Sequence, residues 1–284
     1  MTYQSKTKAR LHAINVLQQR NSRSKLWGLG VFLTMSVAMG VSSILVGNVI
    51  KFSKANILLS SKQPLLVPIL VNGVLLSLYL ALLASAGISK EYDKGTLETL
   101  MVGPVDEISF VIGNFLAHLK VFGLTLLAAL GWSYLCIWLL NFSPRPDIIA
   151  LLFANLFMAS ELIAFGVLTA VWGGKTKNAL IYFILIILFL SGIQLANSVV
   201  ASIVQIENAH VGNSLILVRN VLTTTNRFIQ WISPYSQVRY AMQSILDQRY
   251  FAYLLSMGLM VLQTALLLIG SVLSLKKKGV RGIV

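Results

Sequence analysis

The chain has 284 residues, of which 56% are hydrophobic and only 11% are charged, and its formal net charge at pH 7 is +14. Soluble proteins carry about 25% charged residues, so this composition excludes an ordinary soluble domain. The basic residues flank apolar segments and do not form one basic face, which argues against nucleic-acid binding. The single cysteine, Cys136, excludes an intrachain disulfide and offers no metal cluster.

Six segments are long and apolar enough to cross a bilayer, whose ~30 Å hydrocarbon core requires roughly 20 helical residues. The predicted spans cover about 26–50, 65–88, 118–140, 149–172, 179–205 and 251–275. They predict an all-α, multi-pass membrane protein with one six-span transmembrane domain over residues 1–284. Small residues four apart, such as Gly73 with Ser77 and Ala81 with Ser85, predict close helix packing.

The segment 1–25, before the first predicted span, is polar and basic, so no cleavable signal peptide is expected and the first span is the targeting signal. Within this segment Leu11, Ile14 and Leu17 recur every three residues among basic residues. This spacing predicts an amphipathic helix lying at an anionic inner membrane surface. The alternative is a disordered basic tail.

Basic residues also predict the orientation, because Lys and Arg favour the cytoplasmic side of short loops. If the N-terminus lies inside, the inner segments hold about twice as many basic residues as the outer ones. Both termini are therefore expected in the cytoplasm. The outer segment 205–251 is too long for a simple turn, and its two apolar-periodic parts meet at Ser233-Pro234. They predict two short helices resting on the outer surface, with Trp231, Tyr235 and Tyr240 near the interface.

An acidic stretch lies between the second and third predicted spans, on the expected cytoplasmic side. It contains five of the nine acidic residues of the chain: Glu91, Asp93, Glu98, Asp106 and Glu107. The pattern predicts a short helix over 97–102, capped by Thr96 and ended by Gly103-Pro104. Asp106 stands at the expected N-cap of the next helix, and Glu107 lies in its first turn, where the helix dipole favours negative charge. A short acidic helix between two spans suits the docking of a basic partner.

The stretch KEYDKGTLETLMVGPVDEISFVIGN resembles the E-x-x-x-G-[ST]-x-E-x-L-x-x-x-P segment between spans two and three of ABC-2 type transporter permeases. The matching residues are Glu91, Gly95, Thr96, Leu97, Glu98, Leu100, Pro104 and Val105, followed by Gly113. The later stretch QWISPYSQVRYAMQSILDQRYF is similar to the segment before the last span in permeases of the gliding and copper-maturation branch.

The resemblance implies the transmembrane subunit of an ATP-driven exporter in a bacterial plasma (inner) membrane. Residues 91–105 would form a coupling helix for a separate ATPase subunit, present in two copies, and a second permease chain would complete a homodimer or heterodimer. ATP and Mg²⁺ would bind the partner, so no cofactor, metal or catalytic residue is expected in this chain. The chain indeed carries no G-x-x-x-x-G-K-[ST] phosphate loop.

Among the acidic residues, Glu91 and Glu98 are the expected ATPase contacts, because they occupy matching positions of the motif. Asp106 and Glu107 are expected to serve only the local helix start. The alternative for Glu91 and Glu98 is that they only cap helices and solvate a loop, and the alternative for Asp106 and Glu107 is contact with the partner.

Glu161 lies midway along the fourth predicted span, where an ionised carboxylate costs about 2.5–3.5 kcal/mol, so we expect it to face protein or water. It is a candidate for the substrate pathway or the dimer seam, together with Asn72 and Asn155. The alternative is a structural carboxyl, protonated or paired with His118 or Lys120. For the asparagines, hydrogen bonds between helices are the default interpretation.

Two other functional classes compete with the exporter. An ion-coupled secondary transporter or channel would use Glu161 to carry a proton or cation. A membrane-embedded enzyme is the third class, but the chain has no H-E-x-x-H or G-x-S-x-G motif and only one carboxylate in the middle of a predicted span.

Overall fold

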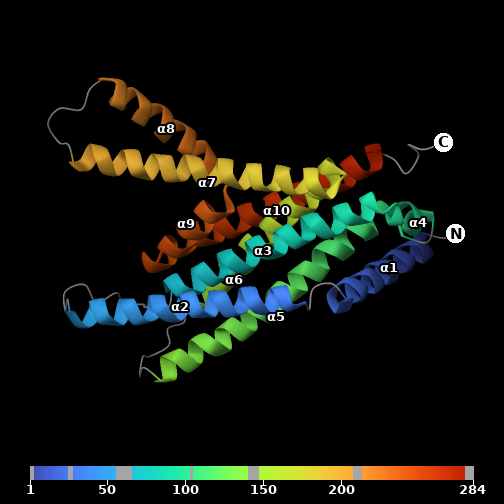
Figure 1. Cartoon of the computed structure of the whole chain (residues 1–284), viewed down its shortest axis with the longest axis horizontal. Coiled ribbons are helices and arrows are strands. Elements are labelled where there is room, and N and C mark those ends of the chain that lie inside the picture. The colour runs from blue at the N-terminus through green and yellow to red at the C-terminus, as the bar shows by residue number, and fades with distance from the viewer. Residues whose placement is uncertain are drawn as a thin grey trace.

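The computed structural model describes residues 3–24, 28–55, 66–102, 105–139, 147–206 and 213–278, and all regular structure in these ranges is α-helical (Figure 1). The helices are α1 (Tyr3–Ser24), α2 (Leu29–Ala55), α3 (Leu66–Asp93), α4 (Thr96–Val102), α5 (Glu107–Leu139), α6 (Asp147–Gly173), α7 (Thr176–Ile206), α8 (Asn213–Ile232), α9 (Pro234–Leu246) and α10 (Tyr250–Lys278).

Five helices in the described part are long and apolar enough to cross a membrane, namely α3, α5, α6, α7 and α10. They correspond to the second to sixth predicted spans and confirm a multi-pass helical membrane protein. The apolar part of α2 found in the described residues, Leu29–Val41, is shorter than a span. The first predicted span therefore stays a prediction, although α2 is helical from Leu29 to Ala55.

The helix α5 begins well before residue 118, where the third span was predicted to start, and runs unbroken for 33 residues. Phe110, Val111 and Phe115 in its early part are buried, and α1 packs against this helix. The candidate span in α5 covers Glu107–Trp132 and so includes these early residues.

The pair α3 and α6 forms the centre of the bundle, with α10, α5 and α7 around it (Figure 1). A Cβ added to Gly166 of α6 would collide with the backbone carbonyl of Ala81 in α3. The hydroxyls of Ser85 and Thr169 lie 3.2 Å apart across the same contact. The small residues predicted to allow close packing therefore do so, because they let two backbones touch.

Gly166→Ala is expected to destabilise the bundle by roughly 1–3 kcal/mol, because the new methyl group would overlap the Ala81 carbonyl and force the two helices apart. Gly87→Ala is the matched control, since a Cβ there meets no atom within 4 Å. Alanine is favoured over glycine in helices by about 1 kcal/mol, so the control should be neutral or stabilising. Thermal unfolding of the purified protein in detergent measures both, and equal melting temperatures would contradict the close approach.

The helices α8 and α9 precede α10 as predicted, but α9 does not rest on a surface. Its residues Pro234, Val238, Ala241 and Ile245 are buried, and the helix packs against both α10 and α6 (Figure 1). Tyr235, predicted near the membrane interface, is partly buried and packs against an internal apolar cluster. The sequence predicted a surface position for α9 because this helix is rich in polar residues. Its small residues nevertheless allow close contact with the bundle.

Candidate functional site

The short helix α4 lies at the end of the bundle where α1 and the last turns of α10 are also found (Figure 1). We call this the α4 end. Gly95, between α3 and α4, has a φ of +67°, a left-handed conformation that glycine adopts without steric cost. Its N–H donates to the carbonyl of Tyr92 at 3.0 Å. This turn ends α3 and redirects the chain into α4, which explains the need for glycine at this motif position.

One face of α4 is fixed to the bundle. Leu97 is 4% exposed and belongs to the main apolar cluster, against which Leu100 also packs. The Thr96 hydroxyl donates to the carbonyl of Glu91 at 3.2 Å, so it ties α4 to α3 and does not act as the predicted cap. Glu98 is exposed. The helix therefore has an anchored apolar side and an accessible carboxylate, while Pro104 of the motif lies outside the described residues.

Glu91, the other carboxylate expected to contact a partner, is only 7% exposed. The Arg20 guanidinium of α1 donates to its Oε1 at 2.7 Å. Next to this ion pair, Asn21 Nδ2 of α1 donates to Asn114 Oδ1 of α5 at 2.5 Å. Glu91 thus holds α1 against the bundle, and of the two expected contacts Glu98 is the accessible one.

The N-terminal segment forms the predicted helix, but its buried face differs from the predicted one. Leu17 is buried and Ile14 is half-buried, whereas Leu11 is 62% exposed and Ala13 takes part in the contact instead. Gly113 of α5, which follows the motif, lies directly beneath Leu17. The helix α1 therefore packs on protein with one face and leaves apolar residues exposed on another.

Asp106 caps α5 as predicted. Its Oδ1 accepts hydrogen bonds from the backbone N–H of Ser109, at 2.9 Å, and from the Ser109 hydroxyl. Arg10 of α1 lies 2.5 Å from its other oxygen. Partial burial by itself raises the pKa of Asp106, but the hydrogen bonds from Ser109 and the charge of Arg10 together outweigh it and lower the pKa. The carboxylate is therefore ionised at neutral pH and forms a second ion pair with α1.

Asp93 has a structural role that the sequence did not indicate. It is the last residue of α3, and its Oδ2 accepts hydrogen bonds from the N–H and hydroxyl of Thr176, at 2.9 and 2.6 Å, at the start of α7. Together with Glu91 and Asp106, it binds groups of this chain. The acidic stretch therefore mainly connects helices of this chain, and of the two carboxylates predicted to contact a partner only Glu98 is exposed.

Glu161 of α6 is fully buried, and neither carboxylate oxygen has a hydrogen-bond partner among the described residues. Neither oxygen is hydrogen-bonded to His118 or Lys120, the two predicted partners. The His118 Nδ1 lies 2.8 Å from the carbonyl of Asn114, and Lys120 is exposed. A charged carboxylate in this position would be costly, so Glu161 is the polar group in the middle of a span that most needs a functional explanation.

The two asparagines proposed for the pathway or seam are both buried. Asn155 Nδ2 donates to the carbonyl of Ile69 at 3.3 Å, joining α6 to α3. This contact fits the default interpretation of a hydrogen bond between helices. The Oδ1 atoms of Asn72 and Asn155 have no hydrogen-bond partner in the described ranges, and a pathway role for these residues stays a prediction.

Neither a scan of protein-family models nor a search of curated proteins finds a significant match to the sequence. Membership of the ABC-2 type family therefore remains a prediction from the 91–105 motif.

Proposed function

We propose that the chain is the transmembrane subunit of an ATP-driven exporter of the ABC-2 type, and that α4 is the element moved by a separate ATPase subunit. The observation that carries the proposal is the construction of α4, in which Leu97 is buried in the bundle and Glu98 is exposed. Because α4 directly follows α3 and precedes α5 along the chain, a force on its exposed face would reach both of these apolar helices.

The helix α1 is connected to α4, and we call the two helices together the coupling unit. Arg20 pairs with Glu91, just before α4, and Arg10 pairs with Asp106, just after it. The two ion pairs thus join α1 to both flanks of the short helix. Movement of α4 would be expected to carry α1 with it, so that an ATPase acts on a block of helices and not on one loop.

In the proposed complex two permease chains, identical or related, share the pathway and two ATPase copies supply the energy. ATP and Mg²⁺ bind to those partners, so this chain is not itself an enzyme. The location in a bacterial plasma membrane and the outward direction of transport follow from the resemblance, and the cytoplasmic placement of the α4 end follows from the distribution of basic residues; all three belong to the proposal.

Affinity purification of the tagged full-length chain from its native membrane tests the proposal. Mass spectrometry is expected to find a soluble protein with a nucleotide-binding phosphate loop in stoichiometric amount, and ATPase activity should co-elute with the complex. A chain that purifies alone and still moves solute in liposomes under an ion gradient would contradict it.

A second candidate function, an ion-coupled transporter or channel, is favoured by one observation. Glu161 is fully buried in a candidate span without a hydrogen-bond partner among the described residues. A carboxyl group in such a place can carry a proton across part of a membrane, and buried ionisable residues in spans often serve that purpose.

Proton uptake by proteoliposomes under an imposed membrane potential separates the two candidates. If Glu161 carries protons, Glu161→Gln should reduce the flux at least about tenfold, because the amide has the same shape but cannot bind and release a proton. Glu107→Gln, a carboxylate outside the interior of the span, is the matched control and should leave the flux unchanged. Equally low flux in wild type and both variants would rule out the second candidate.

A further inference from the structure

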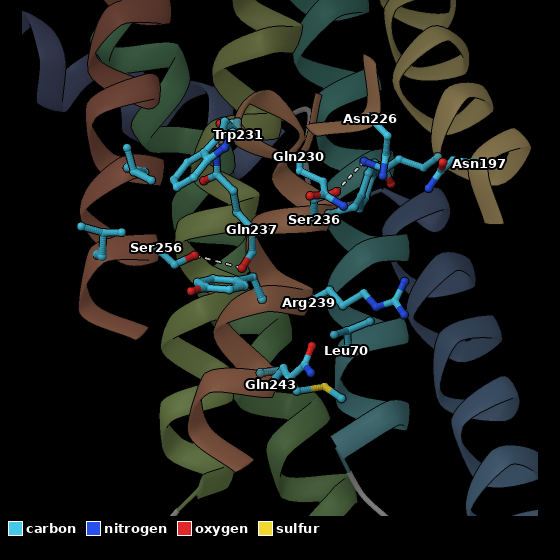
Figure 2. A pocket seen from close by; sticks show the side chains of 16 residues that line it. Leu70, Asn197, Asn226, Gln230, Trp231, Ser236, Gln237, Arg239, Gln243 and Ser256 are labelled. Carbon is cyan, nitrogen blue, oxygen red and sulfur yellow. Dashed lines mark hydrogen bonds between the residues drawn. The ribbon is translucent and has the colours of Figure 1, made fainter. Parts of the chain in front are cut away.

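A polar pocket lies between α3, α7, α8, α9 and α10 (Figure 2), toward the end of the bundle opposite to α4 (Figure 1). Its volume is about 820 Å³, within the range of ~300–1,000 Å³ typical of small-molecule sites. Side-chain amides dominate its polar lining: Gln194, Asn197, Asn226, Gln230, Gln237 and Gln243. Amides both donate and accept hydrogen bonds, so the pocket is built to bind a polar group.

The depth of the pocket indicates where its ligand comes from. Leu70 lies near the start of α3 and Leu255 near the start of α10, where the candidate spans of these helices begin. Ends of spans lie at the level of the lipid headgroups. Tyr240 also lines the pocket, and tyrosine is enriched at that level. Trp231 lies deeper, because its carbonyl accepts a hydrogen bond from Gln263 in the middle of the candidate span of α10. The pocket therefore extends from the headgroup level into the depth of the spans.

Buried acceptors in the lining lack donors within the part of the chain that the structure describes. Asn226 is 7% exposed and Gln237 is 4% exposed, and the amide oxygen of each has no hydrogen-bond partner there. A flip of the Gln237 side-chain amide would not satisfy its oxygen, because its Nε2 donates to the Trp231 carbonyl at 2.5 Å and to Gln263 Oε1 at 2.8 Å. Buried polar groups are nearly always hydrogen-bonded. We therefore expect these oxygens to accept hydrogen bonds from hydroxyl groups of a ligand.

A third polar group of the lining, the hydroxyl of Tyr235, can also form a hydrogen bond with a hydroxyl-rich ligand. The Tyr235 hydroxyl is buried without a hydrogen-bond partner among the described residues, and burial raises the pKa of this phenol. It therefore stays protonated and can donate to an oxygen of the ligand. The pocket thus presents both acceptors and a donor, as a hydroxyl-rich ligand requires.

The charge and apolar surface of the lining complete the description of the ligand. Among the described residues, the lining contains no carboxylate and one guanidinium, that of Arg239, which is exposed and forms no ion pair within the same part of the chain. Figure 2 shows Arg239 extending past Leu70. Leu255 and Leu259 of α10 add an apolar side. A ligand matching this surface has an anionic group, hydroxyls and a hydrocarbon part.

We propose that this pocket binds an anionic phospholipid with a hydroxylated headgroup, of the phosphatidylglycerol type. The phosphodiester pairs with Arg239, the headgroup hydroxyls donate to the amide oxygens of Asn226 and Gln237, and the hydrocarbon part follows Leu255 and Leu259. The inference rests on the pocket alone and does not depend on the ATPase partner or on the direction of transport.

Native mass spectrometry of the full-length protein in detergent tests the site by titration with phosphatidylglycerol, phosphatidylcholine and soluble glycerol phosphate. Phosphatidylglycerol is expected to bind at least about tenfold more tightly than phosphatidylcholine, and glycerol phosphate should not bind measurably. Arg239→Gln and Asn226→Leu should each weaken phosphatidylglycerol binding about tenfold. Arg227→Gln is the matched control, because Arg227 is an exposed arginine of α8 that does not line the pocket.

Three results would overturn the proposal: equal binding of the two lipids, variants that bind phosphatidylglycerol as wild type does, or soluble glycerol phosphate binding as tightly as the lipid. Asn226→Leu removes a buried oxygen that has no hydrogen-bond partner in the described part, so it should fold normally. If its melting temperature nevertheless falls sharply, Arg239→Gln decides the outcome, because Arg239 is exposed and its substitution leaves the packing intact.

Discussion

Glu98→Arg is expected to abolish co-purification of the chain with the proposed ATPase subunit while leaving insertion and folding intact. Glu98 is exposed on α4, and surface substitutions of this kind usually change stability by no more than about 0.5 kcal/mol. At a docking surface, in contrast, the new arginine would lie against the basic residue of the partner that binds the Glu98 carboxylate. Such a like-charge contact costs several kcal/mol of binding free energy. Pull-down yield and melting temperature, measured on the same preparation, separate the two effects.

Asp247→Arg is the matched control for this experiment. Asp247 follows α9 and its side chain is 44% exposed, so the substitution makes the same charge change far from α4. The control should retain the ATPase at normal yield. If Glu98→Arg also retains it, α4 does not dock through its exposed carboxylate and the coupling proposal fails.

The features that the sequence predicted correctly depend on local patterns. Apolar length alone located the five long helices in the described part. The Asp106 cap was also readable, because it involves residues only three apart, as in the hydrogen bond from Ser109 to Asp106. Such signals need no knowledge of the tertiary structure, so they survive in a single sequence.

The features that the sequence missed depend on residues far apart in the chain. Arg20 and Glu91 are separated by 71 positions, and Asp93 and Thr176 by 83. Nothing in the local pattern distinguishes a carboxylate that binds another helix from one that faces a partner. For the same reason the motif grouped Glu91 with Glu98, although the first is buried and the second exposed.

The burial of α9 was missed for a different physical reason. Its buried face includes polar residues such as Gln237 and Ser244, which are hydrogen-bonded inside the protein. A hydropathy pattern assigns such residues to a surface. The amide-lined pocket beside α9 was invisible in the sequence because its lining comes from five helices.

Arg20→Leu is expected to release α1 from the bundle, and to do so more strongly than Glu91→Leu. The Arg20 side chain is 40% exposed, whereas that of Glu91 is only 9% exposed. Loss of the arginine leaves a buried carboxylate without this ion pair, which typically costs about 3–5 kcal/mol. Loss of the glutamate lets the arginine turn toward the surrounding solvent, so the cost should be smaller.

Hydrogen exchange of the α1 amides measures this asymmetry. A local cost of about 3 kcal/mol corresponds to roughly 100-fold faster exchange through local opening, while amides in the centre of α6 should be unaffected. The double variant Arg20→Leu with Glu91→Leu is the decisive comparison, because it removes the buried charge together with its partner. Its α1 should exchange more slowly than that of Arg20→Leu alone. If the α1 amides of Arg20→Leu exchange as slowly as those of wild type, α1 is held mainly by Ala13, Leu17 and Asn21, and the ion pair is incidental to the coupling unit.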